Sequence, residues 1–224
     1  MHPGRLLIAT HNPGKLSELT RLLGDVPFDL VSLADVGINH QVDETGETFE
    51  QNATLKAETY ARLSGLPTLA DDSGLEVDAL DGEPGVRSAR YAGDNASDAD
   101  RIAFLLRKLD NILEADRTAR FRCVIALARP GGPLELHPGA CEGRILEAPR
   151  GSNGFGYDPV FFVPALGKSM AELTTEQKNR VSHRSEAARK AAASLREKGS
   201  ALSGRGLGGS PQNPRGRAGG KGSD

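Results

Sequence analysis

The chain alternates between short apolar runs and amphipathic stretches, and this alternation predicts its first elements. Residues 5–9 (RLLIA) form an apolar run with the length of a buried strand. Leu16, Leu19 and Leu23 then recur at helical spacing, which predicts a helix with one buried face. Asn12 is suited to cap this helix. A strand, a loop and a helix in this order are typical of the start of an α/β domain.

The same patterns predict further elements as far as residue 199. Helices are expected at residues 48–63, 97–113 and 185–198. Strands are expected at residues 67–70, 75–80, 119–130 and 159–164. Between the first two of these strands, residues 71–74 (DDSG) have the composition of a tight turn. Residues 200–224 are dominated by Gly, Pro, Ser and Arg, so we expect a domain over 1–199 and a disordered tail over 200–224.

Composition narrows the functional class. The 224 residues carry a formal net charge of -2, which gives no case for a nucleic-acid-binding surface on the body of the protein. Arg-Gly pieces in the tail suit RNA, but a solvated extension is the favoured interpretation. The two cysteines are not spaced as a zinc site or a redox pair. No signal peptide or membrane-spanning run is evident, so we expect a cytoplasmic enzyme or binding protein.

The first candidate site is the loop THNPGK, which leads into the first helix. Lys15 falls in the first helical turn, where its charge opposes the helix dipole by about 0.3–1 kcal/mol. A nearby anion would reverse that sign, and free backbone N–H groups would add to a phosphate cradle. Ala9 and Leu16 replace the glycine and the hydroxyl residue of a P-loop, so this is a loop of another kind. A turn with a solvated lysine is the alternative. The loop consists of Thr10, His11, Asn12, Pro13, Gly14 and Lys15.

Two adjacent carboxylates form the second candidate. In extended chain Asp71 and Asp72 point to opposite faces, so one serves a site and the other caps the predicted turn at Ser73 and Gly74. Carboxylates of this kind suit Mg²⁺. The alternative is an ordinary acidic turn.

Further candidates lie around the second helix. Glu44 precedes that helix in a loop, and Lys56 shares a helix face with apolar residues. We interpret Lys56 as a charge held at a phosphate or carboxylate, with a snorkelling lysine as the alternative.

Two stretches near the end of the domain complete the candidates. Phe155, among glycines, suits stacking on a nucleobase, or else it belongs to the core. Ser182 is suited to cap the last helix, with His183 and Arg184 in its first turn and Lys178 upstream. Such donors suit the carbonyl oxygens of an oxidised purine or a phosphate, and a solvated basic helix start is the alternative.

The motifs THNPGK, ETGETFEQNATLKA, ADDSGLEVDAL, GFGYDPVFF and SHR, in this order, resemble those of the inosine triphosphate pyrophosphatase family, over about residues 5–197. The resemblance implies an elongated α/β fold of two lobes around a long mixed central sheet, with the cleft between the lobes. It implies a homodimer and Mg²⁺-dependent hydrolysis of ITP, dITP, XTP and dXTP to the monophosphate and pyrophosphate. The task would be to cleanse the nucleotide pool.

The resemblance also implies roles for individual residues. The loop from Thr10 to Lys15 would hold the triphosphate, supported by Lys56 and Ser73. Glu44 and Asp72 would bind Mg²⁺, and Asp72 would orient or activate the attacking water. The base would be held by Phe155, Gly156, Tyr157, Asp158, Lys178, His183 and Arg184.

Two other functions stay open at this point. One is a pyrophosphatase of the Maf type that acts on pyrimidine or modified nucleotides, against which GFGYDP and SHR argue. The other is a nucleotide-binding module without turnover, against which the presence of both Glu44 and Asp72 argues.

Overall fold

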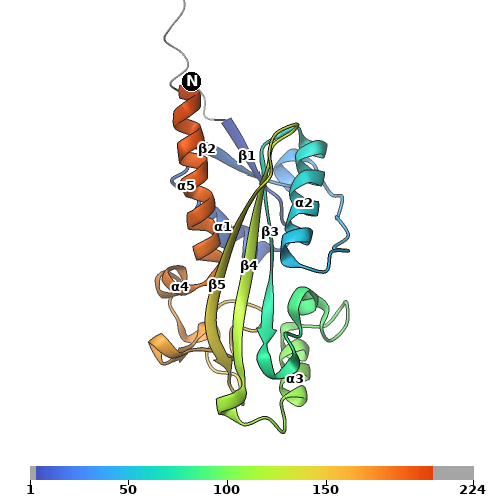
Figure 1. The fold of residues 1–224 in the computed structure, drawn as a ribbon, viewed down its shortest axis with the longest axis vertical. Helices are drawn as coiled ribbons and strands as arrows, with labels where there is room; N and C mark the ends of the chain where they lie inside the picture. Colours follow the sequence, from blue (N-terminus) through green and yellow to red (C-terminus); the bar gives the residue numbers. More distant parts are fainter. Residues whose placement is uncertain (1–3, 204–224) are drawn as a thin grey trace, which may run out of the picture.

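A seven-stranded mixed sheet runs through the protein, which is seen here in a computed structural model that describes residues 4–203 (Figure 1). The strand order is β2-β1-β3-β4-β5-β6-β7. The strands are β1 (Gly4–Ile8), β2 (Phe28–Ser32), β3 (Thr68–Val77), β4 (Thr118–Ala128), β5 (Glu135–Ile145), β6 (Phe161–Val163) and β7 (Lys168–Ser169). β1 pairs in parallel with β2 and β3, whereas all later pairings are antiparallel. The long strands β3, β4 and β5 give the molecule its elongated shape.

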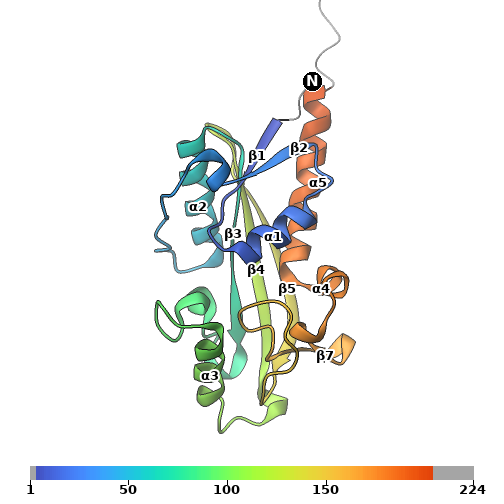
Figure 2. The ribbon, with the colours of Figure 1, turned by 180° about the vertical axis from the view of Figure 1, so that it is seen from behind.

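Helices cover both faces of this sheet. The α-helices are α1 (Pro13–Leu22), α2 (Phe49–Ser64), α3 (Asp98–Lys108), α4 (Thr175–Val181) and α5 (His183–Ser203). Short 3₁₀ helices are η1 (Ala34–Val36), η2 (Asp78–Leu80), η3 (Gly85–Arg90), η4 (Glu114–Asp116), η5 (Pro164–Leu166) and η6 (Met170–Glu172). α1 and α5 lie on one side of the upper half and α2 on the other, while α3 flanks the lower half (Figures 1 and 2). No helix in the described part of the chain is long and apolar enough to cross a bilayer.

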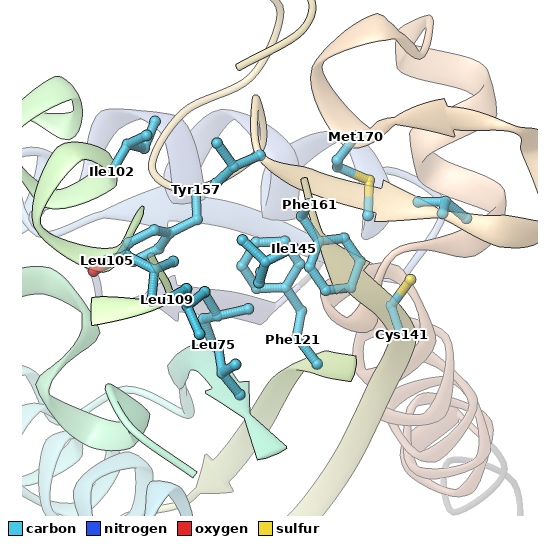
Figure 3. Close-up of a cluster of buried hydrophobic side chains, with 14 of the residues drawn as sticks. Leu75, Ile102, Leu105, Leu109, Phe121, Cys141, Ile145, Tyr157, Phe161 and Met170 are labelled. Atoms are coloured by element: carbon cyan, nitrogen blue, oxygen red, sulfur yellow. The ribbon is translucent and has the colours of Figure 1, made fainter. Parts of the chain in front are cut away.

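Three apolar clusters hold these layers together. In the upper half, one cluster joins the sheet to α1 and α5 through residues such as Leu19 and Ala191. A second joins the opposite face to α2 through Ala53 and Tyr60. The third fills the lower half, where side chains of β3, β4, α3 and the segment before β6 meet around Phe121 (Figure 3). The predicted α/β fold around a long mixed sheet is therefore confirmed.

The predicted turn at residues 71–74 is wrong. β3 runs without interruption from Thr68 to Val77 and pairs with β4 at every position, including Asp71–Gly74. Asp71, Asp72 and Ser73 each contact a charged side chain from a distant helix, so tertiary contacts override the local preference for a turn. Gly74 serves another purpose, because a Cβ atom there would lie 2.4 Å from the carbonyl oxygen of Gly85. It allows η3 to pack directly on the strand.

The sequence patterns also left elements out. β2, β5 and α4 were not predicted, and β5 (ELHPGACEGRI) shows why. It contains Pro138, Gly139 and Gly143, which are depleted in strands. Gly139 is required there, since a Cβ atom would lie 2.2 Å from the carbonyl oxygen of His183. At the end of the domain, α5 continues to Ser203, and most of the predicted tail lies outside the described residues.

Candidate active site

Two adjoining pockets lie where the upper and lower halves meet. The first, called here the aromatic pocket, is lined by residues that include Phe121, Phe155, Tyr157, Lys178, His183 and Arg184. The second, called the polar pocket, is lined by residues that include Thr10, His11, Tyr60, Lys56 and Arg90. Asn12, Lys15 and Glu44 line both pockets and mark their junction.

The loop between β1 and α1 forms one wall of this junction. The Asn12 side chain accepts a hydrogen bond from the Lys15 backbone N–H at 3.0 Å, which confirms Asn12 as the helix cap. Thr10 Oγ1 accepts one from the Asn12 N–H at 3.2 Å, and His11 Nε2 lies 3.1 Å from the Tyr60 hydroxyl. Thr10 and His11 line the polar pocket, and their predicted role in holding phosphate stays a prediction.

The Lys15 side chain is bound to a buried carboxylate. Its Nζ lies 3.0 Å from Asp71 Oδ2, which also lies 3.4 Å from Arg184 Nε. Burial alone would raise the pKa of Asp71, but the Lys15 and Arg184 charges outweigh it and hold this pKa well below the usual range. The alternative of a solvated lysine is wrong, and so is the prediction that Asp71 caps a turn. Asp71 instead holds two cations at the wall of the pockets.

Asp72 points to the opposite face of β3, as strand geometry predicted. Its Oδ2 accepts a hydrogen bond from Asn52 Nδ2 at 3.3 Å, and its Oδ1 lies 3.2 Å from Lys56 Nζ. Burial raises the pKa of Asp72 and Lys56 opposes that rise, while the nearby Glu44 and Asp71 carboxylates add to it. The environments of Asp71 and Asp72 thus move their pKa values in opposite directions, a contrast typical of functional carboxylates.

Lys56 joins Asp72 to Glu44. The Lys56 ammonium donates to Glu44 Oε1 at 2.5 Å and to Asp72 Oδ1 at 3.2 Å. Burial would lower the pKa of Lys56, but the two carboxylates raise it to about 12. The alternative of a snorkelling lysine is therefore wrong, and the predicted charge held at a carboxylate is confirmed.

The same contacts test whether the site suits Mg²⁺. Because Glu44 Oε1 and Asp72 Oδ1 contact one nitrogen atom, they lie no more than 5.7 Å apart, the sum of the two contact distances. Mg²⁺ is commonly held by one or two carboxylates, with waters and substrate phosphates as its other ligands. Residues 4–203 contain no group of three or more His, Cys, Asp and Glu side chains placed to hold a metal. Glu44 and Asp72 match the one or two carboxylates that Mg²⁺ commonly takes from a protein, and they are the residues here that could hold the ion.

Phe155 lines the aromatic pocket. Its ring is half-buried, with Lys178 Nζ 5.0 Å and Arg184 Cζ 5.6 Å from its centroid. Its backbone N–H donates to Asp158 Oδ2 at 3.0 Å, and Lys178 Nζ donates to the same oxygen at 2.6 Å. The alternative of Phe155 as a core residue is wrong. Tyr157 is the core residue of this segment, and its hydroxyl donates to the Ser88 carbonyl oxygen at 3.0 Å.

Gly14 sets the position of Phe155, which leads to a prediction. A Cβ atom at Gly14 would lie 2.8 Å from Phe155 Cδ1, so Gly14→Ala has to displace the ring. Alanine also favours the helix by up to about 1 kcal/mol. We expect Gly14→Ala to raise the KM for the purine nucleotides that the sequence resemblance implies as substrates, without lowering the melting temperature. Gly24→Ala, where the nearest added contact is an ordinary 3.5 Å, is the matched control. Equal KM values for the two variants would contradict this role of Gly14.

The start of α5 completes the aromatic pocket. Ser185 N–H donates to Ser182 Oγ at 3.2 Å, so Ser182 caps the helix as predicted. The His183 ring stacks on Phe121 with centroids 4.8 Å apart. Burial, together with the nearby cationic side chains, holds the pKa of His183 well below its ordinary value, so the ring is neutral at pH 7. Because His183 and Arg184 are buried, the alternative of a solvated basic helix start is wrong.

Several residues of the site were missed in the sequence. Glu18 Oε1 lies 2.9 Å from Lys178 Nζ, and Glu18 Oε2 lies 2.5 Å from Arg184 Nη1. Its position one turn after Lys15 on the predicted helix was a usable signal. Asp98 Oδ2 accepts from the Gly156 N–H at 2.6 Å, a contact for which the sequence holds no signal.

Comparisons with known proteins relate the chain to one family. The model of the Ham1 family matches residues 6–194. A dITP/XTP pyrophosphatase of Geobacter sulfurreducens is 55% identical over 183 residues, which cover 82% of this chain and 92% of that protein. One of Bacillus subtilis is 48% identical over 184 residues, or 82% of this chain and 93% of that protein. The structure of a HAM1 protein from Coxiella burnetii is 42% identical and superposes with a TM-score of 0.80, covering 87% of this chain and 99% of that one. The Staphylococcus aureus Ham1 protein gives a TM-score of 0.78 at 43% identity, with coverage of 87% and 99%.

Proposed function

Because the chain belongs to the Ham1 family, we propose that it hydrolyses noncanonical purine nucleoside triphosphates to the monophosphate and pyrophosphate. The substrates would be ITP, dITP, XTP and dXTP, which arise when purines are deaminated, and their removal would cleanse the nucleotide pool. The named activity of the relatives supports this proposal, as does the arrangement of the two pockets.

The observation that carries the proposal is the position of the carboxylates. A purine suits the aromatic pocket, where Phe155 offers a ring face, and a triphosphate suits the polar pocket beside Thr10 and Lys15. Glu44 lies at the junction of the two pockets. Asp72 lies close to it, because both carboxylates contact the Lys56 ammonium. A nucleotide in this orientation has its α-phosphate at the junction. Hydrolysis at that phosphorus releases pyrophosphate, whereas attack at the γ-phosphate would release orthophosphate.

The side chains of the aromatic pocket suit a base with a 6-oxo group. Lys178 and Arg184 offer N–H donors, and both side chains lie beside Phe155. The 6-oxo group of hypoxanthine or xanthine accepts hydrogen bonds, whereas the 6-amino group of adenine donates them. A pocket of donors would leave polar groups unpaired around adenine, which can discriminate by a factor of about 10⁴.

Mg²⁺ is the proposed cofactor, with Glu44 and Asp72 as its protein ligands. When bound, the ion supplies positive charge at the phosphate oxygens. Asp72 would orient the attacking water and accept its proton, a role that its raised pKa supports. Lys15 and Lys56 would hold the phosphate oxygens, since phosphoryl transfer depends mostly on positioning and charge.

The decisive experiment measures products. With ITP and Mg²⁺ we expect pyrophosphate and IMP as the first products, and little reaction with ATP. Chelation of the metal should abolish turnover, and Mg²⁺ should restore it. Orthophosphate and IDP as first products would overturn the proposal, binding of ITP without any product would favour a binding module, and preference for a pyrimidine triphosphate would favour the Maf type.

Two further parts of the proposal concern assembly and location. A homodimer is implied by the resemblance, and light scattering coupled to size-exclusion chromatography can test it. The cytoplasm is the proposed location because the nucleotide pool is there, and fractionation of cells that express the chain can test that.

A further inference from the structure

Three cationic side chains line the polar pocket, and they differ in how far their charge is already matched. Lys15 lies 3.0 Å from Asp71, and its side chain is 16% exposed. Lys56 is bound to both Glu44 and Asp72, and its side chain is 11% exposed. Two half-buried lysines thus face three carboxylates within 3.2 Å. Much of their charge is already balanced, so a triphosphate, which carries several negative charges, requires a further cation beside them.

Arg90 differs from both lysines. Its side chain is 39% exposed, and its closest carboxylate contact is the 3.6 Å separation between Nη1 and Glu44 Oε2. Its Nη2 also donates to the Glu44 backbone carbonyl at 3.3 Å. These long contacts hold the guanidinium weakly at the mouth of the polar pocket. A guanidinium offers several N–H donors in one plane, and this geometry matches phosphate oxygens.

The backbone that carries Arg90 is firmly placed. Arg90 is the last residue of η3, and Ser88, two residues earlier, is buried against β3. Ser88 Oγ accepts from the Leu75 N–H at 2.9 Å and donates to the Gly85 carbonyl at 2.6 Å. The close approach at Gly74 fixes the same segment on the strand. Because the backbone is fixed and the side chain is loosely held, the guanidinium can exchange Glu44 for another partner with little loss of conformational entropy.

We propose that Arg90 is a further substrate-binding residue, which leaves Glu44 and binds the β- and γ-phosphates, so that it holds the pyrophosphate leaving group. This inference rests on the proposed function. In that reaction the water oxygen forms a bond to the α-phosphorus, and the bond from that phosphorus to the bridging oxygen breaks. The electron pair leaves on the pyrophosphate, and the water proton passes to Asp72. Arg90 donates to the oxygens on which the charge collects.

The test uses pyrophosphate itself as the probe. Binding of pyrophosphate to the full chain is measured by calorimetry, with and without Mg²⁺, for the wild type, Arg90→Gln and Arg90→Lys. We expect Arg90→Gln to weaken pyrophosphate binding roughly 10–100-fold, the range for loss of charge-assisted hydrogen bonds. Arg90→Lys should recover part of that loss, and binding of IMP should be unchanged in every variant. Arg87→Gln is the matched control, because Arg87 lies exposed in the same 3₁₀ helix and outside both pockets.

The outcomes separate this inference from its alternatives. Unchanged pyrophosphate binding in Arg90→Gln would overturn it. If Arg90 only positioned Glu44, the variant would need more Mg²⁺ for half-maximal turnover but would bind metal-free pyrophosphate like the wild type, which also overturns it. Failure of the proposed function would appear elsewhere, as the wrong products from the wild type. If the wild type binds pyrophosphate through Arg90 but releases orthophosphate from ITP, the proposed reaction is refuted. The assignment of Arg90 as a pyrophosphate-binding residue would still hold.

Discussion

Asp72→Asn should lower the turnover of ITP about 10³-fold or more without unfolding the protein. General acid–base assistance is worth about 10²–10⁴-fold, and loss of a metal ligand adds to that effect. The substitution keeps the shape of the side chain, and its one amide oxygen can still accept a hydrogen bond from either Asn52 or Lys56. Because the lost interactions act in the transition state, kcat should fall far more than KM rises. Steady-state kinetics at saturating Mg²⁺ measures both values.

The raised pKa of Asp72 indicates how this substitution affects the stability of the fold. The native pKa of Asp72 is raised mainly by burial, so its ionised form is less stable in the folded protein than in the unfolded chain. Stability is lost as the pH rises from the ordinary carboxylate pKa toward the raised native value, and a neutral asparagine removes that penalty. Because Asp72 also stabilises the charged Lys56, which keeps Glu44 as a partner, the melting temperature of Asp72→Asn at neutral pH should stay near that of the wild type. Turnover near the wild-type value would contradict the role assigned to Asp72.

The wild-type pH profile provides an independent check. Protonated Asp72 can neither accept a proton from water nor bind a cation well. The acidic limb of kcat/KM should therefore lie above the ordinary carboxylate pKa, in the direction of the raised value. An acidic limb at or below the ordinary value would mean that another group controls the rate.

The sequence predicted the elements whose patterns are local. The helix after Asn12 followed from a cap and leucine spacing. The helix expected over residues 48–63 begins after Thr48, where the Gln51 N–H donates to Thr48 Oγ1. The opposite orientation of Asp71 and Asp72 followed from strand geometry alone. In each case the deciding interaction lies within a few residues, where sequence analysis is most informative.

The errors arose where distant residues decide the local structure. The stretch from Asp71 to Gly74 has turn composition, but contacts with Lys15, Lys56 and Arg184 hold its polar side chains in a strand. Those partners come from three helices, and no local pattern encodes their meeting. The Asp98 contact with Gly156 and the place of Arg90 in the polar pocket depend on the fold in the same way.

Asp71→Asn should have the opposite signature to Asp72→Asn. From a turn-capping Asp71, the sequence predicts a milder effect on turnover and a cost in stability. The structure instead gives this carboxylate two cationic partners, Lys15 and the buried Arg184. Removal of one charge from a buried ion pair leaves its partners uncompensated, at a cost of about 3–5 kcal/mol in the free energy of unfolding. For a domain of this size that corresponds to a fall of roughly 6–20 °C in melting temperature.

The pH dependence of the melting temperature tests whether Asp71 is the ionised partner of Lys15 and Arg184. Burial alone would raise the pKa of Asp71, but Lys15 and Arg184 lower it, so the ionised group stabilises the fold above the ordinary carboxylate pKa. This contribution is lost as the pH falls toward the lowered native value, and the wild type and Asp71→Asn should converge in melting temperature under strong acid. In kinetics, the released cations should raise the KM for ITP more than they lower kcat, because Lys15 and Arg184 line the pockets. Thermal melts of the two asparagine variants across pH test both carboxylates at once. If Asp72→Asn were the destabilised variant and Asp71→Asn the stable but inactive one, the roles assigned to these neighbours would be reversed.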